Sequence, residues 1–124
     1  CEAESFGTPL GLHAIAEKIG GKRPAGTVFR GRVPVAAHFS ELEPKARERN
    51  LITSRILRLK GLVPGLNTGP SRDSYTRYIY IHGTNHEDRV GQPFSGGCIE
   101  MRNADVIWLF ERLAPGDLVW IEAP

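Results

Sequence analysis

The chain has 124 residues, enough for one domain with a single hydrophobic core. Its 16 Lys and Arg residues nearly balance 14 Asp and Glu residues, and the resulting net charge of +2 argues against the strongly basic surface of a nucleic-acid-binding protein. No apolar run in the sequence approaches the length needed to cross a bilayer.

Strands are the elements that most of the chain favours. Fourteen glycines and nine prolines divide it into short segments, a composition typical of many strands joined by turns. Partial alternation of apolar and polar residues predicts strands at 10–19, 26–33 and 51–62. Aromatic and β-branched residues make 74–82 the strongest strand prediction, and 117–123 closes the chain as a further strand.

Two helices are expected between these strands. Ser40 and Glu43 have the spacing of a capping box and predict a short polar helix around 40–50. Apolar residues at helical spacing in NADVIWLFERLAPG predict the main helix, which Pro115–Gly116 ends. Trp108 and Trp120 are expected in the core or at an interface.

The stretch with chemical potential is 82–101, HGTNHEDRVGQPFSGGCIEM. Cys98 follows two glycines, which allow a sharp turn and let amide N–H groups point at a developing oxyanion. His82 ends a predicted strand, and a nearby imidazole can take the proton of a thiol. These residues are sufficient parts for acyl transfer through a thioester. An inert buried thiol and a histidine bonded to backbone remain the alternatives.

The cysteine count predicts neither a disulfide framework nor a zinc site, since Cys1 is the other cysteine and no CxxC pair is present. A disulfide between Cys1 and Cys98 is the less favoured alternative, because its geometry across a whole domain is demanding. We expect no metal and no cofactor.

Three motifs resemble those of the L,D-transpeptidase catalytic domain, the YkuD-like family. HGTN at 82–85 resembles the family's strand-terminal HGT-like element, and SGGC at 95–98 resembles its Ser-x-Gly-Cys turn. TPLG at 8–11 resembles the TPxG element near the start of the domain. The resemblance covers nearly the whole chain, so 1–124 is expected to be one catalytic domain that lacks the strands usually found before the TPxG element.

The resemblance implies a fold and a function. The expected fold is mainly β, with two packed mixed β-sheets in a sandwich or barrel-like arrangement, one main helix near the C-terminus and a short helix around 40–50. Family members form a thioester with a donor stem peptide of peptidoglycan and pass it to an acceptor amine, and carbapenems typically acylate the same cysteine. A periplasmic or cell-wall-associated location is implied. An L,D-carboxypeptidase and a non-catalytic wall-binding module are the alternatives.

Carried over to this sequence, the resemblance makes Cys98 the nucleophile and His82 its base, with the Gly83 carbonyl orienting the imidazole. The oxyanion hole would be formed by backbone N–H groups of Gly97 and Cys98, with Gly96 as a further candidate. The residues expected to contact substrate are Thr84, Asn85, Ser95, Glu100, Arg102 and Tyr80.

Two positions depart from the family pattern. Gly96 stands where the family often has His, which bears on how the thiol is held. Glu100 stands where the family commonly has Arg, and a carboxylate there would repel a substrate carboxylate if that Arg normally meets one. Arg102, two residues further on, is the candidate replacement.

Overall fold

The computed structural model describes residues 10–30, 32–49, 51–64, 66–68, 75, 79–90 and 98–121. In chain order, the described helices and strands are β1 (Gly11–Ile19), β2 (Val28–Arg30), β3 (Val33–Ala36), α1 (Pro44–Arg47), β4 (Ile52–Gly61), β5 (Tyr80–Gly83), β6 (Ile99–Met101), α2 (Asn103–Arg112) and β7 (Leu118–Ile121). Single 3₁₀ turns lie at Phe39–Glu41 and Glu87–Arg89.

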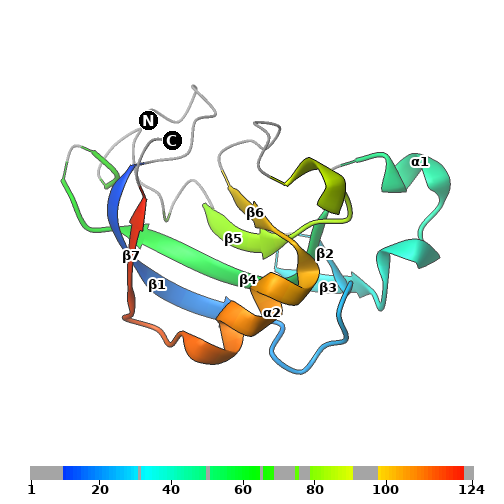
Figure 1. Ribbon diagram of the computed structural model, residues 1–124, viewed down its shortest axis with the longest axis horizontal. Helices are drawn as coiled ribbons and strands as arrows, with labels where there is room; N and C mark the ends of the chain where they lie inside the picture. Colours follow the sequence, from blue (N-terminus) through cyan, green and yellow to red (C-terminus); the bar gives the residue numbers. More distant parts are fainter. Residues whose placement is uncertain are drawn as a thin grey trace.

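The long strand β4 organises the fold. It pairs with β1, β2 and β5, and the seven described strands join into one sheet with the order β3-β2-β4-β1-β7, to which β5 and β6 attach beside β4 (Figure 1). Every strand pair is antiparallel except β5–β6, which is parallel. The mainly β prediction is confirmed, but the described residues show no second sheet. With ten residues, β4 is long enough to pair with three strands. This pairing joins into one sheet the strands that we expected to form two.

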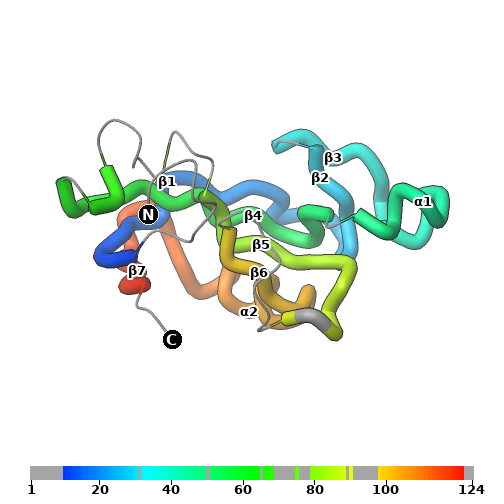
Figure 2. Tube along the Cα trace, turned by 90° about the horizontal axis from the view of Figure 1, so that it is seen from above, coloured from blue at the N-terminus to red at the C-terminus, as the bar shows by residue number. Residues whose placement is uncertain are grey.

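The helix α2 covers one face of this sheet, which we call the α2 face (Figure 2). Leu57 of β4 and Ile81 of β5 point to this face and pack with Val106 and Phe110 of α2 in the main hydrophobic core. Because side chains alternate along a strand, the neighbouring residues point away from α2. A smaller apolar cluster on this opposite face contains Phe29, Ile56 and Tyr80.

The two predicted helices are present, but the first begins differently from the prediction. Glu43, not Ser40, is the N-cap of α1, and the Glu43 side chain makes no capping hydrogen bond. Ser40 instead lies in a 3₁₀ turn, where its N–H and hydroxyl both contact Nδ1 of His38. The capping box is therefore wrong: this local partner for Ser40 leaves Pro44, with its fixed φ, to start the helix.

Strand predictions for β1, β4 and β7 are confirmed, while two short strands were missed. The predicted strand 26–33 is divided into β2 and the start of β3, and β6 was not predicted. Strands of three or four residues, such as β6 and β3, are too short to show a clear alternation in a sequence. Of the predicted strand 74–82, the structure describes Tyr75 and residues 79–82, with β5 beginning at Tyr80.

Neither tryptophan lies in the core. Trp108 on α2 is 56% exposed and Trp120 on β7 is 64% exposed. Trp108 instead stacks with the guanidinium of Arg112, 3.9 Å from its ring centroid. In the part of the chain that the structure describes, no helix has the length and apolar character needed to cross a membrane.

Candidate active site

The parallel pair β5–β6 brings the predicted catalytic residues together. His82 is in register with Glu100, and two residues earlier on each segment the N–H of Tyr80 donates a hydrogen bond to the sulfur of Cys98 (N···Sγ 3.4 Å). Residues two apart on a strand share a face. Tyr80, His82, Cys98 and Glu100 therefore all belong to the face of the sheet opposite α2.

His82 is held in one orientation and one tautomer. Its side chain is buried, and Nδ1 lies 2.5 Å from the carbonyl oxygen of Gly83. A carbonyl can only accept a hydrogen bond, so Nδ1 carries the hydrogen and Nε2 is left as the acceptor. Burial lowers the pKa of His82 below its usual value, while the Gly83 carbonyl and the Glu100 carboxylate raise this pKa by smaller amounts.

Cys98 is a half-buried thiol immediately before β6. It packs against the cluster of Phe29, Ile56 and Tyr80, which shields one side of the sulfur. The hydrogen bond from the Tyr80 amide favours the negatively charged form of the thiol, because a donor stabilises a thiolate more than a neutral sulfur. Cys1, the other half of the disulfide alternative, lies outside the described residues.

Gly83 is required by close packing. A Cβ at this position would lie 2.6 Å from the carbonyl oxygen of Thr53 and 2.7 Å from Oδ1 of Asn103. Both distances are shorter than real Cβ contacts, so a side chain here would displace the backbone that carries the Gly83 carbonyl. The glycine thus serves the orientation of His82 through its small size.

Asn103 is a residue that the sequence reasoning missed. It is the first residue of α2 and is buried; its Oδ1 accepts hydrogen bonds from the hydroxyls of Thr53 (2.6 Å) and Ser54. Its Nδ2 donates to the carbonyl oxygen of Thr84 (2.8 Å), and its backbone N–H donates to Oε2 of Glu87 (2.8 Å). One side chain therefore ties α2 and β4 to the segment that follows His82.

Thr84 and Asn85, predicted to contact substrate, make contacts within the protein. The buried Thr84 accepts a hydrogen bond at Oγ1 from the N–H of His86 (3.0 Å). Asn85 accepts from the N–H of Leu51 (3.0 Å) and donates to the carbonyl of Arg47 (2.8 Å). The two Asn85 bonds hold the segment after β5 against the last residue of α1 and the residue before β4.

The remaining predicted site residues lie in sequence on either side of the Cys98–Glu100 segment or on the neighbouring strand β5. Arg102 is exposed at the N-cap of α2, directly after β6. Tyr80 is buried, and its backbone N–H is the group that donates to the Cys98 sulfur. Ser95, Gly96 and Gly97 lie outside the described residues, so the geometry covers Cys98 but not the rest of the predicted oxyanion hole.

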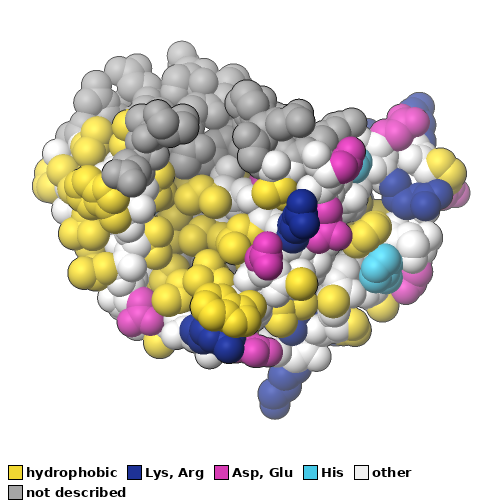
Figure 3. Space-filling view, viewed as in Figure 1, with side chains coloured by type: hydrophobic (Ala, Val, Ile, Leu, Met, Phe, Trp, Pro, Cys, Tyr) yellow, Lys and Arg dark blue, Asp and Glu magenta, His cyan; other side chains and the backbone are white. Residues whose placement is uncertain are grey.

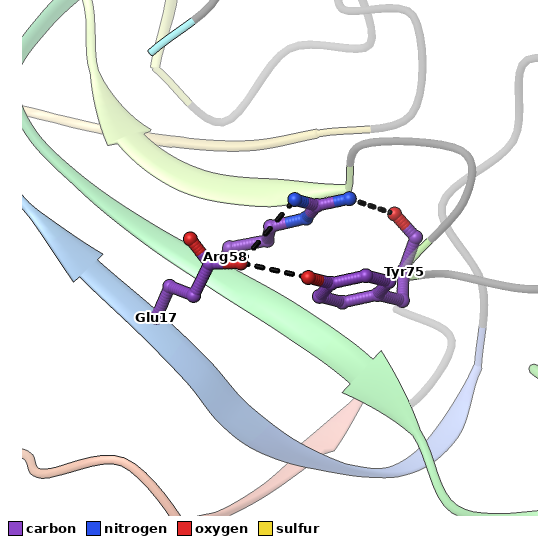
Figure 4. A network of polar contacts seen from close by, with 3 residues as sticks. All are labelled: Glu17, Arg58 and Tyr75. Carbon is purple, nitrogen blue, oxygen red and sulfur yellow. Dashed lines mark hydrogen bonds and ion pairs between the residues drawn. The ribbon is translucent and has the colours of Figure 1, made fainter.

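A polar network that the sequence did not predict lies on the same face (Figure 4). Arg58 is in register with Glu17 on one side and with Tyr80 on the other, which places it one strand from the Tyr80–Cys98 pair. Its guanidinium donates to Glu17 Oε1 (3.3 Å) and to the Tyr75 carbonyl (2.8 Å), and it lies 3.6 Å from the centroid of the Tyr75 ring. The Tyr75 hydroxyl donates to Glu17 Oε1 (2.8 Å), and this bond is the main cause of the raised pKa of Tyr75.

Hydrophobic side chains also gather on the surface over β1 and β7, at the left of Figure 3. Leu118 and Trp120 of β7 are each 64% exposed there. Val119 and Ile121, which alternate with them, pack against the main core. The outward residues of β7 thus form an apolar edge that is separate from the Cys98 region.

Comparison with known proteins identifies the family of this chain. Residues 2–121 match the L,D-transpeptidase catalytic domain family (YkuD), and the chain belongs to that family. A segment of 45 residues is 49% identical to the protein of Bacillus subtilis (strain 168) named "Putative L,D-transpeptidase YqjB". The segment is 36% of this chain and spans about a quarter (26%) of that protein. No solved structure matches the chain.

Proposed function

We propose that the chain is a cysteine L,D-transpeptidase that forms a thioester between Cys98 and a donor stem peptide and passes the acyl group to an acceptor amine. The observation that carries this proposal is the β5–β6 register, which puts Cys98 and His82 on one face of neighbouring strands. From the spacing and rise of β-strands, their Cα atoms are about 8 Å apart, a separation that a thiol and an imidazole can bridge. Membership of the family supports the same activity.

The proton transfers follow from the tautomer of His82. With the Nδ1 hydrogen donated to Gly83, Nε2 is the atom that accepts the proton when the S–H bond of Cys98 breaks. The sulfur keeps the electron pair and adds to the donor carbonyl. When the tetrahedral intermediate collapses, the C–N bond breaks and the proton on Nε2 passes to the leaving amine, which gives the thioester. Attack by the acceptor amine reverses these steps.

The substrate class is the stem peptide of peptidoglycan, which implies an extracytoplasmic protein. We place the stem along the face opposite α2, beside the Glu17–Arg58–Tyr75 network. A cavity of about 540 Å³ adjoins this network and is lined in part by Glu17, Lys60 and Tyr75. Arg102, exposed beside β6, is the described cation nearest in sequence to Cys98 and a candidate contact for a substrate carboxylate.

The test is the intact mass of the protein after incubation with a carbapenem. We expect one covalent adduct on the wild type, its loss in Cys98→Ala and its retention in Cys1→Ala, which is the matched control. An unchanged mass for the wild type, or an adduct that survives Cys98→Ala, would overturn the proposal. Product analysis with purified muropeptides then separates transfer to an amine from hydrolysis, the L,D-carboxypeptidase alternative.

A further inference from the structure

We propose that Glu100 is a positioning residue that stabilises the protonated imidazole of His82 while the thiol is activated, an inference that rests on the proposed function. Glu100 is the residue in register with His82 on the neighbouring parallel strand, and both side chains belong to the same face of the sheet. The sequence suggested a different role for this carboxylate, namely reading the charge of the substrate.

The need for such a group comes from the burial of His82. The imidazole is 3% exposed, and a buried histidine resists taking up a proton because its charged form loses hydration. Activation of Cys98 requires that proton to be accepted. A carboxylate beside the imidazole offsets the lost hydration, and Glu100 exerts this attraction on His82.

The same carboxylate also repels the thiolate that forms on Cys98, so the two effects must be weighed. The Cα atoms of Glu100 and His82 lie at the spacing of neighbouring strands, about 4.8 Å, whereas the Cα atom of Cys98, two residues before Glu100, is about 6.6 Å from that of Glu100. The imidazolium therefore feels the carboxylate more strongly than the thiolate does. The net effect of Glu100 favours proton transfer from sulfur to nitrogen.

The other charged and titratable groups around His82 do not replace Glu100. On the face opposite α2, β4 supplies Ile56 directly across from His82 and Arg58 two residues further along, and β5 itself supplies Tyr80. Arg58 is positive and disfavours an imidazolium. Among the described residues on these elements, Glu100 is the acidic side chain in register with His82.

The first experiment is substrate-free and follows the His82 imidazole by NMR as pH is varied, in a Cys98→Ser background so that the thiol does not titrate with it. We expect Glu100→Gln to lower the pKa of His82, Glu100→Arg to lower it further, and Glu100→Asp to keep it closer to the parent value. Glu111→Gln, an exposed acid-to-amide change on α2, is the matched control and should leave it unchanged. An identical His82 titration in all variants would overturn the inference, whether or not the protein is a transpeptidase.

The second experiment measures the maximal rate of acylation at saturating carbapenem against pH. The maximal acylation rate of Glu100→Gln should be lower than that of the wild type by roughly threefold to tenfold near neutral pH, and that of Glu100→Arg lower still. The acidic limb of the pH–rate profile of Glu100→Gln should also be displaced to lower pH. If the substitutions change only the half-saturating concentration, or only the preference between amidated and free-acid muropeptides, Glu100 reads the substrate and the positioning role is wrong. Loss of the wild-type adduct would instead contradict the proposed function and leave the NMR result standing.

Discussion

The two faces of the sheet are built from the same strands but have opposite character. On the α2 face, Leu57 and Ile81 meet Val106 and Phe110 in a continuous apolar core. On the opposite face, the residues next to them in sequence include Arg58 and His82, both buried and both hydrogen-bonded. The first face stabilises the domain through burial of apolar area, and the second holds polar groups in fixed positions at a cost in desolvation.

This difference shows how the sheet separates stability from chemistry. The alternation of side chains lets β5 contribute Ile81 to the core and His82 to the site without a conflict between them. Changes to the α2 face should therefore alter the free energy of unfolding, while changes to the opposite face should alter reactivity.

The largest effect is expected from His82→Ala, which removes the base from the opposite face. Acylation by a carbapenem should slow by about two to four powers of ten, the usual worth of a positioned acid–base group. Stopped-flow or mass-resolved kinetics would measure it. His86→Ala is the matched control, because the His86 imidazole contacts the carbonyl of Arg47 at the end of α1. Equal losses from both substitutions would mean that the base is wrongly assigned.

Leu57→Ala should destabilise the protein by removing a side chain from the core on the α2 face. Leu57 is fully buried, and replacing a buried leucine by alanine costs about 2–5 kcal/mol of unfolding free energy, because apolar contacts are lost and a cavity remains. Urea unfolding would measure this change. Leu118→Ala, at an exposed position, should stay within about 0.5 kcal/mol. The separation of the faces fails if Leu57→Ala leaves stability intact but abolishes acylation of the folded protein.

Gly83→Ala should affect both faces, because Gly83 lies where β4, β5 and α2 meet. The new Cβ would have to push away backbone and Asn103 atoms less than 3 Å distant, and such overpacking typically costs about 1–3 kcal/mol. The shift should also move the Gly83 carbonyl and slow acylation. In Gly21→Ala the nearest described group to the new Cβ is the Phe110 side chain at 3.1 Å, so this control should be milder in urea unfolding and unchanged in acylation. A fully active Gly83→Ala protein would argue against this role of the carbonyl.

The smallest effect concerns pH. His82 on the opposite face and His13 on the α2 face are both buried, and burial lowers the pKa of each below its usual value of 6.5. The unfolded chain therefore binds more protons than the folded protein as pH falls through about 6.5, so stability should decrease from pH 7.5 to pH 5. Urea unfolding at both pH values would measure it, and His13→Gln should flatten the dependence in part. A stability that is constant over this range would contradict the assignment.

The sequence by itself determined much of the local structure and the candidate chemistry. The partial alternation of β1 and β4 and the helical spacing of α2 are visible in the sequence because both are patterns of neighbouring residues. Cys98 and His82 stood out for the same kind of reason: a thiol behind two glycines and a histidine at a strand end are local features. The family followed from those motifs.

Only the tertiary structure decided how these residues are arranged. The single sheet depends on β4 pairing with three strands, and strand partners far apart in the chain leave no local signal. The roles of Asn103 and Arg58 likewise depend on groups about 20 to 50 residues away in sequence, which fold to within hydrogen-bonding distance. The pairing of Glu100 with His82 is set by the register of two parallel strands, because register arises from the packing of the whole sheet and not from either strand.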